Sequence, residues 1–168
     1  RAASAAGVPL KIAGTGPLEA ELRMLAADRP GIEMLGYVAG EALWTLVRNS
    51  RAVVLPSQWY ENAPMSVLEA GALGKPVIGA DIGGIPELLV EGETGYVFEA
   101  CNVQSLTDAL RRVQAMPGER LRSMGEAARR HVETNFTRER YRDEMLVLYA
   151  SLGAGSSSPE AASHGRAD

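Results

Sequence analysis

The chain has 168 residues, of which 46% are hydrophobic, and it carries a formal net charge of −4. This length suits one domain with a real core, and the hydrophobic share is within the range of globular proteins. The acidic balance, without any run of basic residues, argues against nucleic acid as the main partner. Cys101 is the only cysteine, which excludes an intrachain disulfide and a cysteine-based metal cluster.

Short apolar strands alternate with helices along most of the chain. The first predicted helix has Pro17 in its first turn and Leu18, Leu22 and Leu25 on one face. The predicted strands are residues 8–13, 32–35, 51–55, 76–80 and 95–98. The predicted helices are residues 17–27, 41–49, 64–73, 85–90, 102–116, 118–134 and 137–152, the fifth of them capped by Asn102 or Ser105.

This alternation is typical of an α/β fold, a Rossmann-like parallel sheet with helices on both faces. Ligands bind such sheets beyond the carboxyl ends of the strands. The segments at Gly14, Gly36, Glu61 and Gly83-Gly84 each follow a predicted strand, so we expect them to share one rim. Residues 1–152 form this predicted domain, and the Gly/Ser/Ala-rich residues 153–168 are predicted to be a disordered tail.

Two glutamates eight positions apart, Glu61 and Glu69, are the strongest functional signal. Glu61 lies in the loop after the third strand and Glu69 on the next helix. The first turn of that helix presents N–H groups that suit a phosphate. Carboxylate oxygens suit the two hydroxyls of a vicinal diol. We therefore expect Glu69 to hold a ribose diol, Glu61 to hold sugar hydroxyls, and the amides of Met65 and Ser66 to hold a diphosphate.

Structural interpretations compete with this one. Ser66-x-x-Glu69 matches a capping box, which would make Glu69 a residue of the helix start. Pro64 argues against the box, because a proline in the first turn places Ser66 inside the helix. Taken alone, Glu61 also fits a solvated loop residue.

The glycines after the strands have several interpretations too. Gly14-x-Gly16 could open a dinucleotide fingerprint, but Glu19 stands where the third glycine belongs. A tight turn, or the close approach of a ligand to the backbone, fits Gly14 and Gly16 as well. Gly83 and Gly84 fit either a turn before a helix or a second loop that faces phosphate or sugar.

Other chemistry is not indicated. Trp59 and Tyr60 fit stacking on a ring or partial burial beside the strand. His131 and His164 have no nucleophile beside them in the predicted elements, which argues against Ser-His or Cys-His catalysis. The sequence contains no Asp-x-Asp and no His/Cys ligand cluster, so we expect no metal and no cofactor.

A series of short motifs then points to a family by its order and spacing. The motifs are Gly14-Thr15-Gly16-Pro17-Leu18-Glu19, Leu35-Gly36-Tyr37-Val38, Val54-Leu55-Pro56-Ser57, Glu61-x7-Glu69-Ala70, Gly74-Lys75-Pro76-Val77-Ile78, Gly83-Gly84-Ile85-Pro86-Glu87, Gly92-Glu93-Thr94-Gly95 and Asn135-Phe136-Thr137. From Ile12 to about Leu148 the chain resembles the C-terminal domain of retaining GT-B glycosyltransferases, in the glycosyl transferases group 1 family.

The resemblance implies a site for a UDP- or GDP-sugar. It assigns Glu61 a catalytic place at the donor sugar and Glu69 the ribose. It implies that the backbone amides of Ala63, Met65 and Ser66 meet sugar and diphosphate, that the base lies near Gly36, Tyr37 and Val38, and that Gly14, Gly16, Gly83 and Gly84 also face the donor. Transfer with retained configuration, without a metal, is implied as well. The departing diphosphate would deprotonate the acceptor, and its charge must be stabilised.

The chain departs from the family pattern in two ways. Asn62-Ala63-Pro64 replaces a glycine-rich turn, and Pro64 removes one amide donor. The family's first strand, which is central to the sheet, is absent together with an Arg and a Lys that neutralise the diphosphate and with the whole acceptor domain. The first residue is Arg1 rather than Met, so we expect a fragment or a processed chain whose start lies near the end of the family's first helix.

Two expectations follow from these departures. The chain alone is expected to bind nucleotide-sugar weakly at most and not to catalyse transfer. Two sheet edges are expected to be exposed, which would invite pairing with other chains.

The leading hypothesis is the donor-binding part of a hexosyltransferase acting on a glycan, a lipid-linked or a small-molecule acceptor. The alternatives are a UDP-sugar epimerase of the same fold and a non-catalytic remnant of a glycosyltransferase. No signal peptide and no apolar run of ~20 residues is present, so a cytoplasmic protein is expected, with membrane association only through the missing half.

Overall fold

The computed structural model describes residues 1–153 and divides the chain into two compact units, residues 1–134 and 135–168. The predicted disordered tail therefore lies outside the described residues, apart from Gly153. The strands are β1 (Leu10–Ala13), β2 (Ile32–Gly36), β3 (Val53–Leu55), β4 (Val77–Ala80) and β5 (Gly95–Phe98). The helices are α1 (Ala2–Ala6), α2 (Glu19–Ala27), α3 (Gly40–Arg48), α4 (Met65–Ala72), the 3-10 turn η1 (Pro86–Leu88), α5 (Val103–Ala115), α6 (Gly118–Asn135) and α7 (Arg138–Ser151).

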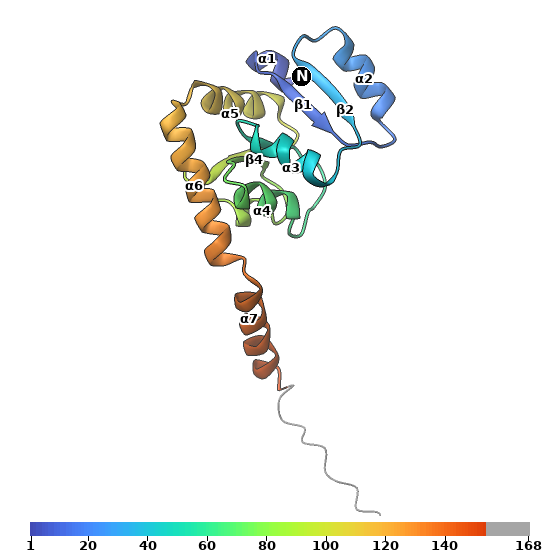
Figure 1. Cartoon of the computed structure of the whole chain (residues 1–168). Helices are drawn as coiled ribbons and strands as arrows, with labels where there is room; N and C mark the ends of the chain where they lie inside the picture. The colour runs from blue at the N-terminus through green and yellow to red at the C-terminus, as the bar shows by residue number, and fades with distance from the viewer. Residues whose placement is uncertain (154–168) are drawn as a thin grey trace, which may run out of the picture. The chain divides into compact units, whose positions relative to one another are not determined.

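All the strands pair in parallel, but they form two separate sheets (Figure 1). One sheet has the order β1-β2 and the other β3-β4-β5. A doubly wound sheet with the order 3-2-1-4-5-6 would give these two groups if its central strand were left out. The expected parallel α/β fold is confirmed. Among the described strands, β1 and β3 each pair on one side only, so each has an edge without a strand partner in addition to the outer edges of β2 and β5.

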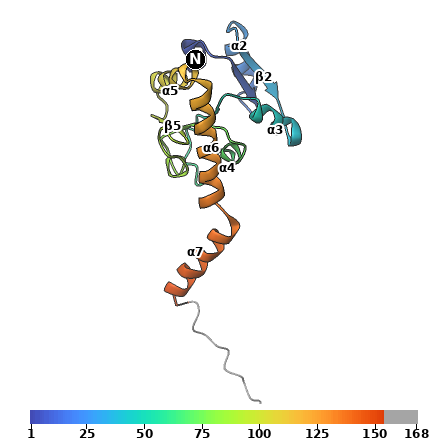
Figure 2. The same cartoon turned by 60° about the vertical axis from the view of Figure 1, so that its left-hand side comes forward.

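The three-stranded sheet carries the core and is covered on both faces. All four residues of β4 are buried, which explains why its sequence is continuously apolar. Ile78 and Ala80 pack with residues of α5 and α6, including Val113 and Met124, whereas Val77 packs with residues of α4. Figure 2 shows α4, α5 and α6 around this sheet.

Close helix packing over this sheet requires glycine at two positions. A Cβ on Gly71 of α4 would lie 2.7 Å from a methyl group of Val132, and a Cβ on Gly125 of α6 would overlap the carbonyl of Gly74. Since real Cβ atoms do not approach so closely, α4 and α6 can touch at this distance only without side chains there.

The outer edge of β5 is covered by a side chain. Glu91 accepts a hydrogen bond from the N–H of Val97 over 2.7 Å. The guanidinium of Arg112 lies 4.0 Å from the ring centre of Tyr96 and forms a 3.5 Å ion pair with Glu91. This edge therefore has a partner for one strand amide, in contrast to the free edges of β1 and β3.

The two-stranded sheet is less buried. Lys11 and Glu33 form a 3.6 Å ion pair across β1 and β2 with more than half of each side chain exposed. The leucine face of α2 is largely open, since Leu18, Leu22 and Leu25 are 61%, 39% and 41% exposed. In a two-stranded sheet with few neighbours, α2 has no deep core to pack against.

Helix ends follow the predicted chemistry. Asn102 rather than Ser105 caps α5, because its Oδ1 accepts from the Ser105 N–H over 3.0 Å. The side chain of Arg51, which lies just before β3, donates to the carbonyl of Val113 over 3.1 Å and so satisfies the last turn of α5.

In the second unit Thr137 caps α7 by accepting from the Arg140 N–H over 3.1 Å. Several apolar side chains of α7 are exposed, among them Val147 at 71%. None of the described helices meets the length and hydropathy of a membrane span.

Candidate functional site

The loop between β3 and α4 holds Glu61 at the carboxyl end of the three-stranded sheet. Glu61 is half-buried, and its Oε1 accepts a hydrogen bond from the Ser57 hydroxyl over 3.1 Å. Trp59 and Tyr60, which precede it, are 79% and 81% exposed, so the expected alternative of partial burial for these aromatic rings is wrong. The loop thus presents two exposed aromatic rings and one anchored carboxylate.

Gly83 and Gly84 lie against the backbone of this loop. The Gly84 N–H donates to the carbonyl oxygen of Glu61 over 2.7 Å. A Cβ on Gly83 would lie 2.8 Å from the amide nitrogen of Glu61, and one on Gly84 would overlap the carbonyl of Asn62. The two glycines are therefore required for close packing of two loops, and the amide of Gly84 is already engaged within the protein.

Helix α4 begins after Pro64, which is the N-cap residue and makes no side-chain hydrogen bond there. Ser66 is consequently inside the first turn, so the capping-box interpretation of Glu69 is not supported. Val67 already donates to the carbonyl of Pro64 over 3.1 Å, but no hydrogen bond engages the N–H of Met65 or Ser66 among the described residues. These two amides lie at the end of the helix that attracts anions.

Glu69 lies on the second turn of the same helix and is half-buried. Its carboxylate has no hydrogen-bond or ion-pair partner among residues 1–153. Met65 is 62% exposed, and Ala63 and Ser66 are exposed as well. The exposed first turn therefore has one carboxylate before it in the chain and one after it.

The end of the two-stranded sheet holds the other predicted donor residues. The Gly14 N–H donates to the Gly36 carbonyl over 2.7 Å, which joins the loop after β1 to the last residue of β2. A Cβ on Gly14 or Gly16 would meet no atom within 4 Å, so open space lies in front of both backbones. Tyr37 is 79% exposed and Val38 half-buried.

The structure thus brings the predicted residues together in two groups. Gly14 and Gly36 form one, and Glu61 with Gly83 and Gly84 forms the other. No hydrogen bond or ion pair between described residues links the groups to each other. All of these loops follow strand carboxyl ends, where ligands bind in parallel sheets.

Sequence reasoning missed Ser57 as a residue of this site. Its hydroxyl is the one side-chain group that contacts the Glu61 carboxylate among the described residues. Ser57 stands in the quoted Val54-Leu55-Pro56-Ser57 motif, four positions before Glu61. A hydroxyl so close in sequence to a candidate carboxylate is the signal that points to it.

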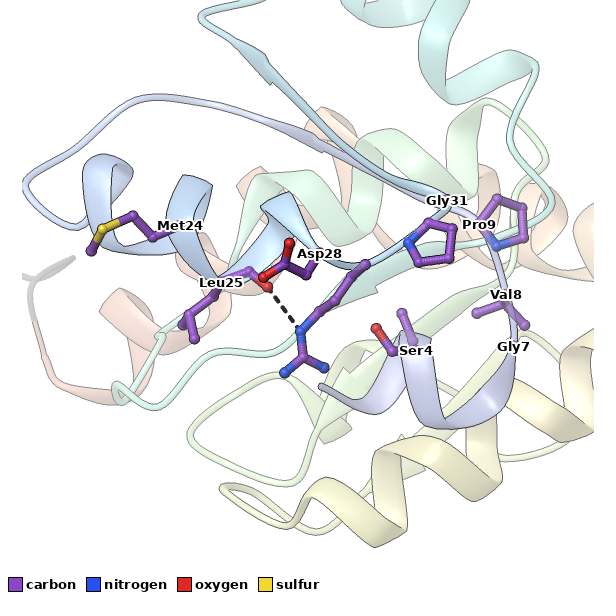
Figure 3. A pocket seen from close by; sticks show the side chains of 11 residues that line it. Ser4, Gly7, Val8, Pro9, Met24, Leu25, Asp28 and Gly31 are labelled. Carbon is purple, nitrogen blue, oxygen red and sulfur yellow. Dashed lines mark hydrogen bonds between the residues drawn. The ribbon is translucent and has the colours of Figure 1, made fainter.

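A cavity lies elsewhere in the first unit. It measures about 850 Å³ and opens between α1, the end of α2 and the segments that lead into β1 and β2. Figure 3 shows Ser4, Val8, Met24, Leu25 and Asp28 along its wall. Since this is the amino end of the strands and none of the predicted donor residues lines it, it is not the candidate site.

The described residues contain no group of three or more His, Cys, Asp or Glu side chains that could hold a metal ion. The candidate site offers carboxylate acceptors and amide donors around a helix N-terminus. That donor set fits hydroxyl groups on either side of a phosphate.

The chain is similar to proteins of one known family. The model of the family described as glycosyl transferases group 1 matches residues 2–131. The chain is 30% identical over 161 residues to a glycogen synthase of Mycobacterium tuberculosis. The aligned region covers 92% of this chain and 37% of the synthase. It therefore spans little more than a third of that relative.

Two solved structures share the fold. Sucrose-phosphate synthase from Thermosynechococcus elongatus superposes with a TM-score of 0.75 and 26% identity, covering 92% of this chain and 42% of that one. HepE of Anabaena, crystallised in complex with UDP-glucose, gives a TM-score of 0.73 at 19% identity, covering 89% of this chain and 44% of that one.

Proposed function

The chain belongs to the glycosyl transferases group 1 family, and on that premise we propose that it forms the nucleotide-sugar donor site of a retaining glycosyltransferase. The parent protein would move a hexose from a UDP- or GDP-sugar to a glycan, a lipid-linked or a small-molecule acceptor. The observation that carries the proposal is the exposed, unengaged first turn of α4 between Glu61 and Glu69.

Each group of the site has a role that follows from its chemistry. The amides of Met65 and Ser66, at the positive end of the helix dipole, would hold the diphosphate, with the exposed Ala63 beside them. Glu69 would accept from the ribose hydroxyls and Glu61 from those of the sugar. Gly14, Gly16, Tyr37 and Val38 would border the base, where open backbone lets a planar ring approach.

These groups suit transfer without a metal. The charge that develops on the departing diphosphate would be met by the helix N-terminus and by cations of the whole protein. That diphosphate would take the proton of the acceptor hydroxyl as the new bond to the sugar forms. Because HepE, which shares the fold, was crystallised with UDP-glucose, UDP is the first nucleotide to test.

The acceptor would be bound by the acceptor domain of the whole protein. A cytoplasmic location is expected, with contact to a membrane only where the acceptor is lipid-linked. These statements concern the parent protein, since the chain spans 37% of the glycogen synthase that it resembles.

Calorimetric titration of the full-length protein with UDP, GDP, UDP-glucose and GDP-mannose tests the proposal. Replacing Glu69 by Ala is expected to weaken the binding of the nucleotide and of the nucleotide-sugar equally, because both contain the ribose. Replacing Glu61 by Ala is expected to weaken the binding of the sugar-bearing ligands alone, by about tenfold.

The exposed Glu126 of α6 gives a matched control, since Glu126→Ala removes a carboxylate outside the site. No binding of any of the four ligands by the wild-type protein would contradict the proposal. An epimerase would instead interconvert UDP-sugars without an acceptor, which product analysis would reveal.

A further inference from the structure

Ser57 makes a set of short contacts around one hydroxyl. Its Oγ lies 3.1 Å from Oε1 of Glu61, 3.2 Å from the carbonyl oxygen of Trp59 and 3.4 Å from the Trp59 amide nitrogen. A serine hydroxyl has one proton to donate and two lone pairs with which to accept. It can therefore donate to only one of the two acceptors at a time.

The carboxylate is the stronger acceptor of the two, because hydrogen bonds to ionised groups are shorter and stronger than those to neutral carbonyls. The arrangement that satisfies most groups has the Trp59 N–H donating to Ser57 and the Ser57 hydroxyl donating to Glu61. This short relay ties the Glu61 side chain to the backbone of its own loop.

The backbone of Glu61 is fixed from the other side. The Gly84 N–H donates to its carbonyl oxygen over 2.7 Å, and Gly83 and Gly84 leave no room for a side chain against residues 61 and 62. Main chain and carboxylate are thus held by separate groups. The restraint on the carboxylate depends on Ser57, whereas the restraint on the main chain does not.

We propose that Ser57 is a positioning residue that orients the Glu61 carboxylate toward the donor sugar. This inference rests on the proposed function, because it assumes that Glu61 meets the sugar. Without the hydroxyl, Glu61 would keep its backbone position but gain rotamer freedom. Ordering the side chain on binding would then cost part of the affinity for the sugar, and none of the affinity for the nucleotide.

The test compares Ser57→Ala with Ser57→Thr, which keeps a hydroxyl, and with Ser123→Ala on the exposed surface of α6 as control. In the full-length protein, UDP-glucose should bind Ser57→Ala about tenfold more weakly than wild type, while UDP binds unchanged. Ser57→Thr should recover most of the loss, and Ser123→Ala should match wild type. Equal affinities of wild type and Ser57→Ala for UDP-glucose, or equal losses for UDP and UDP-glucose, overturn the proposal.

A second measurement needs no ligand. Denaturant unfolding of Ser57→Ala, Glu61→Ala and the double variant forms a double-mutant cycle, in which residues in contact give non-additive effects. Coupling is expected, and additivity overturns the proposal. If wild type binds neither UDP nor UDP-glucose while the cycle shows coupling, the function proposed for the site fails, but the contact on which the positioning role depends stands.

Discussion

Gly84 and Glu61, 23 positions apart in the sequence, are joined by a 2.7 Å hydrogen bond from the Gly84 N–H to the Glu61 carbonyl. The bond connects the loop after β4 to the loop after β3. Because a Cβ on Gly84 would overlap the carbonyl of Asn62, the two loops can lie this close only with glycine at position 84. The position of the candidate catalytic glutamate is therefore set partly by a residue on a different loop.

Replacing Gly84 by Ala is expected to destabilise the fold by about 1–3 kcal/mol, as overpacking does, and to weaken UDP-glucose binding because the Glu61 loop must move. Denaturant unfolding and calorimetry of the full-length protein measure the two effects. Gly118→Ala is the control, since a Cβ there meets no atom within 4 Å. An unchanged stability and affinity in Gly84→Ala would show that the loop packing is not needed.

Gly16 offers the opposite case, a glycine with open space in front of it. Gly16→Leu should fold with nearly wild-type stability, because no described atom lies where the side chain begins. It should nevertheless lose nucleotide binding, since the new side chain fills the space proposed for the donor. Melting temperature and UDP affinity separate the two effects, and a variant that still binds UDP like wild type would place the donor elsewhere.

The free edges of β1 and β3 predict self-association of the chain when it is expressed by itself. Unpaired strand N–H and C=O groups offer hydrogen bonds to another chain. At the edge of β5, by contrast, the Val97 N–H is already bonded to Glu91. Sedimentation at increasing protein concentration should show species larger than a monomer. A monomer at all concentrations, with one cooperative melting transition, would refute this prediction.

The chain expressed by itself is also expected not to transfer sugar. No Lys or Arg among the described residues forms a salt bridge with Glu61 or Glu69, and the chain spans 37% of the glycogen synthase that it resembles. The cations that are proposed to stabilise the charge of the transition state belong to the rest of the parent protein, so the chain by itself is expected to lack them. Sugar release from UDP-glucose, followed by chromatography with and without acceptor mixtures, checks this; turnover by the chain alone would contradict it.

Local chemistry made much of the fold predictable. The strand-helix alternation, the Asn102 cap of α5 and the start of α4 after Pro64 all depend on residues within a few positions of one another. Strand ends were less accurate, because Pro9 and Arg51 lie in predicted strands but outside β1 and β3. Pro9 has no N–H with which to extend a strand ladder, and the Arg51 side chain bonds to the end of α5, a segment distant in the sequence.

The sequence by itself determined the pair Glu61 and Glu69 and its place around a helix N-terminus, because the spacing of a loop and one helix is a local property. Only the tertiary structure decided that the Leu22 face of α2 is half open and that Gly84 holds Glu61. These depend on which distant segments meet, and packing between segments is fixed by the whole set of side-chain and backbone contacts rather than by any local pattern.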